Sequence, residues 1–95
     1  MAVAIEMTFE GATAEQYEQV LELMGLAPGR PTPPGALFHW MTVTDSGLHI
    51  VDGWESREVF DQFAAEQIGP YSAQAGITNP PQMTYYDVHT YLSAT

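Results

Sequence analysis

The residues best suited to acid–base chemistry in this chain are one aspartate and two histidines on predicted strands. Asp52 interrupts the otherwise apolar run IVDGW, two residues before Trp54. A carboxylate buried there without a cation would hold a proton more readily than in water, which suits proton transfer. An indole N–H or a tyrosine hydroxyl on it would indicate a structural role, and an edge position would leave it hydrated. His39 and His89 could exchange protons near neutral pH, so we predict Asp52, His39 and His89 as candidate catalytic residues.

Other chemistry-bearing patterns are weak. The histidines form neither an i, i+4 helical pair nor an alternating strand pair, so the spacing does not indicate a metal site. Without cysteine, the chain has no thiolate nucleophile and no cysteine-ligated zinc. The loop GLAPGRPTPPG (25–35) lacks the lysine and the spacing of a phosphate-binding loop. We therefore expect no metal and no cofactor.

Charge narrows the range of partners. The net charge is −10, and Arg30 and Arg57 are the only Lys or Arg residues. Such a field repels nucleic acid and anionic membrane surfaces, so we expect neither as a partner. A small hydrophobic or aromatic molecule fits better. The N-terminal residues lack the basic region of a signal peptide, and no apolar run reaches the roughly 18 residues of a membrane span. These features favour a cytoplasmic protein.

The order of predicted elements is βαββαβ in one domain, residues 1–95. A Thr13–Gln16 capping box begins the first helix and Gly25 ends it. Ser56 caps the second helix, which Gly69-Pro70 should break. The predicted strands are 2–9, 36–44, 48–54 and 83–92. This order is that of a ferredoxin-like α+β fold with a four-stranded antiparallel sheet.

Strand register decides which side chains share a face. A three-residue loop over 45–47 pairs Thr44 with Leu48. Trp40 then lies opposite Asp52, and His39 faces away from it, although a slip of one residue would reverse this. The face toward the helices would carry Phe38, Trp40, Thr42, Ile50, Asp52 and Trp54. We predict a hydrophobic, aromatic-lined cavity there, with plain core packing as the alternative. Predicted ligand contacts are Phe38, Trp40, Trp54 and whichever of Tyr85 and Tyr86 shares that face.

The opposite sheet face also carries large apolar residues. A second copy of the chain stacked on it would close a barrel between the two subunits. We therefore expect a homodimer.

Three segments resemble the dimeric α+β barrel proteins, whose best-known branch is the antibiotic biosynthesis monooxygenases. They are IVDGWESREVFDQF, PPGALFHWM and YYDVHTYL, which are similar to segments of small, uncharacterised bacterial proteins of this type. The resemblance implies a ferredoxin-like fold that dimerises into an α+β barrel.

The resemblance also indicates which activities to expect. The superfamily includes cofactor-independent oxygenases, polyketide cyclases and heme-degrading enzymes. Trp54 matches the pocket tryptophan of the heme enzymes, but residues 57–68 lack their iron-binding histidine. We expect a cofactor-independent monooxygenase or cyclase acting on an aromatic or polyketide-like compound. The alternative is a non-catalytic ligand-binding or accessory homodimer.

Overall fold

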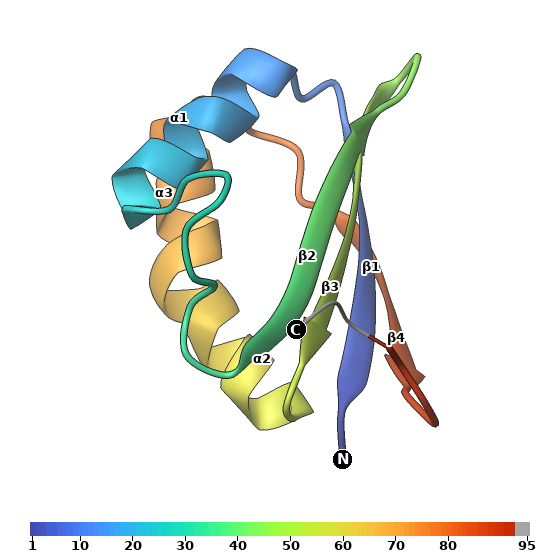
Figure 1. Cartoon of the computed structure of the whole chain (residues 1–95). Coiled ribbons are helices and arrows are strands. Elements are labelled where there is room, and N and C mark those ends of the chain that lie inside the picture. Colours follow the sequence, from blue (N-terminus) through green and yellow to red (C-terminus); the bar gives the residue numbers. More distant parts are fainter. Residues whose placement is uncertain (93–95) are drawn as a thin grey trace.

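The computed structural model describes residues 1–92 as a four-stranded sheet with helices on one face (Figure 1). The elements follow the predicted order: β1 (Val3–Glu10), α1 (Ala14–Met24), β2 (Ala36–Val43), β3 (Gly47–Trp54), α2 (Arg57–Phe63), η1 (Ala64–Ile68), α3 (Gly69–Gln74) and β4 (Gln82–Asp87). In residues 1–92, no helix combines the length and apolar character that crossing a lipid bilayer requires.

The sheet is antiparallel, with strand order β2-β3-β1-β4. Alternate residues of β1 and β3 point toward the helices and form the core with Phe60 of α2. The buried hydrophobic residues of these strands are Val3, Ile5, Met7, Phe9, Leu48, Ile50 and Trp54. This arrangement confirms the predicted ferredoxin-like α+β fold.

Both predicted ends of α1 are confirmed. The Thr13 hydroxyl accepts a hydrogen bond from the Gln16 backbone N–H at 3.2 Å, and Gln16 Oε1 accepts one from the Thr13 N–H at 3.0 Å. Gly25 ends the helix in the left-handed conformation, with φ of 77°.

The predicted break at Gly69-Pro70 is wrong, because α2, η1 and α3 form one continuous helix with no loop between them. Gly69 has a right-handed helical φ of −59°, and its N–H donates to the Ala64 carbonyl five residues earlier. Proline has no N–H, and its ring crowds the preceding turn of an α-helix. The wider π-helical turn η1 leaves room for Pro70 and keeps the helix continuous.

The predicted hairpin register is also wrong, by one residue. Thr44 and Gly47 exchange backbone hydrogen bonds, so the loop is two residues long, and Val43 rather than Thr44 lies opposite Leu48. Gly47 is not free to act as a loop residue because it pairs with Glu10 in the β1–β3 ladder. His39 consequently lies opposite Asp52, and Trp40 lies opposite Val51.

Two further features of the sheet are a bulge in β2 and the early end of β4. The β2–β3 register shifts between Ala36 and Phe38, which leaves Leu37 as an extra, bulged residue. The last strand ends at Asp87, earlier than predicted, and the start of the stretch that follows is fixed by the Val88 N–H donating to the Ala2 carbonyl at 3.0 Å.

The continuous helix predicts the effect of Gly69→Ala. Replacing a glycine that has right-handed helical dihedrals by alanine stabilises a protein, because it reduces the conformational entropy of the unfolded chain. At Gly69 the added Cβ would lie 3.5 Å from the Ala64 carbonyl oxygen, an ordinary contact distance. We expect the free energy of unfolding to rise by about 0.5–1 kcal/mol. Gly25→Ala is the control: its left-handed conformation should lower stability by about 1 kcal/mol. Urea denaturation measures both, and a loss of stability in Gly69→Ala would contradict a helix through this residue.

Candidate functional site

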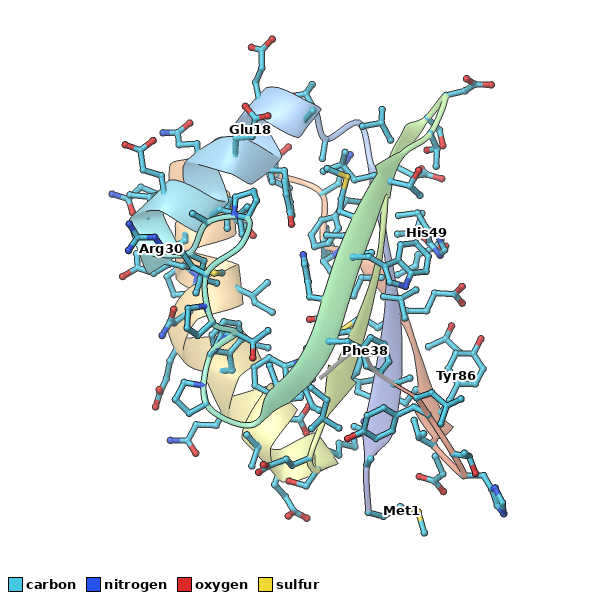
Figure 2. The ribbon with its side chains drawn as sticks, viewed as in Figure 1. Met1, Glu18, Arg30, Phe38, His49 and Tyr86 are labelled. Carbon is cyan, nitrogen blue, oxygen red and sulfur yellow. The ribbon has the colours of Figure 1, made fainter. Side chains whose placement is uncertain are left out.

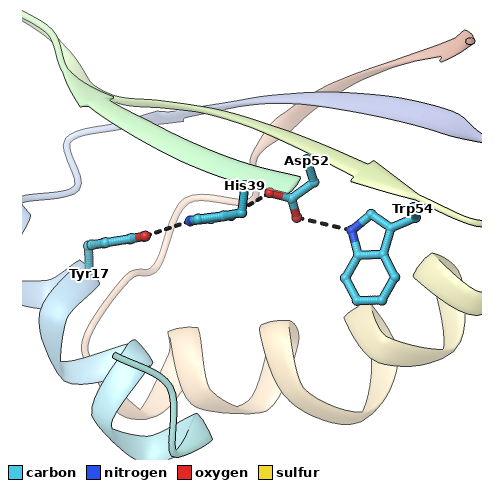
Figure 3. Close-up of polar contacts among 4 residues, drawn as sticks. All are labelled: Tyr17, His39, Asp52 and Trp54. Carbon is cyan, nitrogen blue, oxygen red and sulfur yellow. Dashed lines mark hydrogen bonds and ion pairs between the residues drawn. The ribbon is translucent and has the colours of Figure 1, made fainter. Parts of the chain in front are cut away.

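A series of hydrogen bonds joins four side chains between the sheet and α1 (Figure 3). Tyr17 Oη lies 2.5 Å from His39 Nε2, and His39 Nδ1 lies 2.5 Å from Asp52 Oδ1. The indole N–H of Trp54 donates to the second carboxylate oxygen, Asp52 Oδ2, at 3.2 Å. Phenol, imidazole, carboxylate and indole therefore form one connected polar group.

Secondary structure places each member. Asp52 and Trp54 are two residues apart on β3, so both side chains point toward the helices. The two-residue hairpin loop sets His39 of β2 directly opposite Asp52. Tyr17 lies in the first turns of α1, and its hydroxyl points toward His39 (Figure 3).

The partners determine the proton positions in the neutral state. An ionised carboxylate can only accept hydrogen bonds, so His39 Nδ1 carries the hydrogen that Asp52 accepts. The other ring nitrogen, Nε2, then has a free electron pair and accepts the hydrogen bond that Tyr17 donates. Both nitrogens of His39 are thereby occupied, and the oxygen of Tyr17 is the end of the series open to a ligand.

This polar group borders a cavity of about 420 Å³ between the helices, the 25–35 loop and the sheet. The volume lies in the range of small-molecule sites. Tyr17, His39, Asp52 and Trp54 line it. Its remaining walls are mainly apolar, and include Met7, Phe9, Val20, Leu21, Met24, Met41, Leu48, Ile50, Phe63, Ile68 and Ile77.

Burial and the nearby Asp52 carboxylate raise the pKa of Tyr17 above its ordinary value of 10.0, with burial the larger cause. Both effects disfavour the tyrosinate. Tyr17 therefore keeps its proton at neutral pH and can act as a hydrogen-bond donor or as a carrier between a ligand and His39.

Among the solved structures similar to this chain are three proteins from different bacteria. A monooxygenase from the gene ActVA-Orf6 of Streptomyces coelicolor, in complex with Nanaomycin D, is 20% identical, with 99% of this chain and 92% of that chain covered and a TM-score of 0.56. A putative antibiotic biosynthesis monooxygenase from Deinococcus radiodurans is 15% identical, with 100% and 99% covered and a TM-score of 0.57. A variant of SnoaB, a cofactor-independent oxygenase from Streptomyces nogalater, is 16% identical, with 98% and 96% covered and a TM-score of 0.57.

The chain has the fold of the antibiotic biosynthesis monooxygenase-like proteins. No protein-family model matches the sequence, and a comparison with curated proteins likewise finds no match. The predicted resemblance is thus confirmed at the level of the fold, which by itself does not define an activity.

Asp52 has the hydrogen bond from an indole N–H that was one of its predicted alternatives. The residue is only 5% exposed, and both oxygens accept hydrogen bonds, one from the indole of Trp54 and one from His39. The indole contact is the predicted structural one. The histidine contact was not predicted, because the predicted register turned His39 to the other face.

Phe38 and Trp40 border the cavity as predicted, but their predicted sheet face is wrong. Both border the cavity, but their rings lie on the sheet face away from the helices, which we call the outer face. The Trp40 ring packs edge-on against His49 at a centroid distance of 5.5 Å. The Phe38 ring covers Gly53, where an added Cβ would lie 2.2 Å from it. The predicted face shared by Phe38, Trp40 and Thr42 with Asp52 is therefore wrong.

The remaining candidates lie outside the cavity wall. Tyr85 faces the helices and packs against Phe60 and beneath Arg57. Tyr86 lies on the outer face (Figure 2) and its hydroxyl donates a hydrogen bond to Glu6. His89 follows the end of β4, is exposed and pairs with Thr90.

Tyr17 is the site residue that the sequence did not reveal. Its position in the apolar stripe of α1 indicates only that it faces the sheet. Its hydroxyl becomes important because His39 lies opposite it, and that placement depends on the hairpin register. As for metal ligands, no cluster of three or more His, Asp or Glu side chains suited to an ion occurs in residues 1–92.

The Trp54–Asp52 hydrogen bond predicts the effect of Trp54→Phe. Phenylalanine keeps an aromatic ring in the core but leaves Asp52 Oδ2 without its donor. We expect this to cost about 1–3 kcal/mol beyond the packing loss, because a buried charged acceptor is left unsatisfied. In an Asp52→Leu background that extra cost should disappear. Urea denaturation of the wild type, the two single variants and the double variant measures the coupling energy between Trp54 and Asp52. Equal costs in both backgrounds would show that the indole N–H does not stabilise the carboxylate.

Proposed function

We propose that the cavity binds a flat aromatic or polyketide-like molecule, and that the protein catalyses its cofactor-independent monooxygenation or its cyclisation. The observation that carries this proposal is the Tyr17–His39–Asp52 hydrogen-bond series on the wall of an apolar cavity. The fold shared with a monooxygenase and a cofactor-independent oxygenase supports the same class of reaction.

The proposed first step removes a proton from a phenolic or enolic hydroxyl of the substrate. Because both nitrogens of His39 are occupied, this proton enters at the oxygen of Tyr17 while the Tyr17 proton passes to His39 Nε2. The Asp52 carboxylate stabilises the imidazolium that forms. The apolar walls keep water from competing for the substrate anion.

In the oxygenase reaction the electron-rich anion itself reduces dioxygen. A bond forms between the substrate carbon and one oxygen atom, and the proton held at His39 returns to the peroxide. The peroxide then loses water and leaves a carbonyl group. One oxygen atom ends in the product and the other in water; the substrate hydroxyl and the C–H of the attacked carbon supply the two hydrogens, and the substrate supplies all four electrons.

Cyclisation would begin with the same proton transfer. The anion would attack a carbonyl carbon of the same molecule instead of dioxygen, and oxygen would not be consumed. Oxygen uptake therefore distinguishes the two reactions.

Replacing His39 should nearly abolish turnover. In His39→Gln an amide can still accept the Tyr17 hydrogen bond but cannot take up its proton. With anthrone or dihydroxynaphthalenes as substrates, we expect turnover to fall by about 10²–10⁴-fold, as is usual when a general base is lost. Asp52→Asn should lower it in the same direction. An oxygen electrode and mass spectrometry of the products measure the rates.

The control is His49→Gln, a histidine on the outer face. It should turn over substrate at a rate close to wild type. If the wild-type protein binds these compounds but converts none of them, and the His39 and Asp52 variants lose only thermal stability, the non-catalytic ligand-binding alternative holds.

We also propose that two copies pair through the outer face of the sheet. Helices cover the other face (Figure 1), whereas Trp40 and Tyr86 on the outer face remain 47% and 50% exposed. The carboxylate at the centre of this face, Glu6, already accepts hydrogen bonds from His49 and Tyr86, which lower its pKa. An exposed aromatic surface with its polar groups paired suits a subunit interface.

Trp40→Glu tests this pairing. Two-fold symmetry would place the new carboxylate and its symmetry mate on the same interface, where like charges repel. We expect light scattering to give twice the 10.5 kDa of the chain for the wild type and the single-chain mass for the variant at micromolar concentration. Raising the salt concentration should strengthen wild-type association, because it screens the repulsion between two copies of charge −10. Trp40→Phe is the control and should remain dimeric; a monomeric wild type would refute the pairing.

A further inference from the structure

We infer that Tyr17 is a redox-active tyrosine. It donates one electron to an organic radical held in the cavity, such as a phenoxyl or peroxyl radical, while its hydroxyl proton moves to His39 Nε2. This activity goes beyond the proposed proton transfer and does not depend on it.

The geometry of the Tyr17–His39 pair carries this inference. A phenol that loses an electron becomes a very strong acid, so a base bonded to its hydroxyl makes the oxidation easier. Tyr17 Oη lies 2.5 Å from His39 Nε2, and the planes of the two rings are parallel within 2°. At this distance the hydroxyl hydrogen can point at the electron pair of Nε2. The proton can therefore cross as the electron leaves.

The Asp52 carboxylate lies next to the positive charge that proton transfer would create on His39. Its Oδ1 atom lies 2.5 Å from Nδ1, so the imidazolium formed by proton transfer meets a negative charge at once. The indole of Trp54 fixes the other carboxylate oxygen and keeps Asp52 in this orientation. The products of the step are a neutral Tyr17 phenoxyl and an ion pair of imidazolium and carboxylate. The Asp52 carboxylate stabilises this ion pair without a rearrangement of solvent.

Because Tyr17 is partly buried, the loss of its electron is coupled to the transfer of its hydroxyl proton. The raised pKa of Tyr17 keeps the phenol protonated at neutral pH, so a tyrosinate is not the electron donor. Oxidation must then remove the electron and shift the proton together. The step balances without a further reactant: the cavity radical gains one electron and becomes an anion, Tyr17 loses one, and the proton stays on His39.

Two other tyrosines lack such a base. The Tyr85 hydroxyl bonds to the sulfur of Met83, which is a weak acceptor. The Tyr86 hydroxyl bonds to Glu6, whose lowered pKa makes it a poor base. These two residues provide matched controls within the same chain.

The test needs no natural substrate. The whole protein is illuminated with ruthenium tris(bipyridine) and persulfate as the one-electron oxidant, frozen, and examined by electron paramagnetic resonance. We expect a tyrosyl signal in the wild type that narrows when ring-deuterated tyrosine is incorporated, which distinguishes it from a tryptophan radical. Tyr17→Phe should lose most of this signal, and His39→Gln should lower its yield several-fold.

Tyr85→Phe and Tyr86→Phe should keep the signal, and circular dichroism checks that every variant is folded. A tyrosyl signal that persists in folded Tyr17→Phe would overturn the assignment, as would an equal yield in folded His39→Gln. Because the readout uses a chemical oxidant, its result is separate from the presence or absence of substrate turnover.

Discussion

The arrangement of this protein depends on one buried carboxylate. Asp52 is enclosed by the sheet and the helices, where an ionised group needs hydrogen-bond donors on both oxygens. Trp54, from the same strand, supplies one donor, and His39, from the neighbouring strand, supplies the other. Meeting that requirement turns an imidazole toward the cavity, and the imidazole in turn engages Tyr17 of α1. A structural necessity of the core thus generates the polar group that gives the cavity its chemistry.

Much of the fold could be predicted from local sequence signals. The Thr13 and Ser56 caps and the alternation of β1 act over a few residues, and each is found as expected. The helix through Pro70 could not be predicted from such signals, because a π-helical turn accommodates the proline only when the surrounding helix packs on the sheet.

The site was predicted only in part, because it depends on pairing between strands. Asp52, Trp54 and His39 were recognised as candidates from residue type and position, but their grouping depends on the length of one hairpin loop. Competition between β1 and the loop for Gly47 decides that length, and this is a tertiary effect. Phe38 and Trp40 were assigned to the wrong face, and Tyr17 was missed, for this same reason.

The hairpin also has a consequence for how such a protein could diversify. If this turn instead held three residues, so that Thr44 paired with Leu48, β2 would move by one position relative to β3. Trp40 would then replace His39 beside Asp52, and the imidazole would move to the opposite surface. Such a change at a distant turn would exchange a proton-accepting interior for an aromatic one without a substitution in the cavity wall, so turn length is a route by which proteins of this fold can acquire different reactivity.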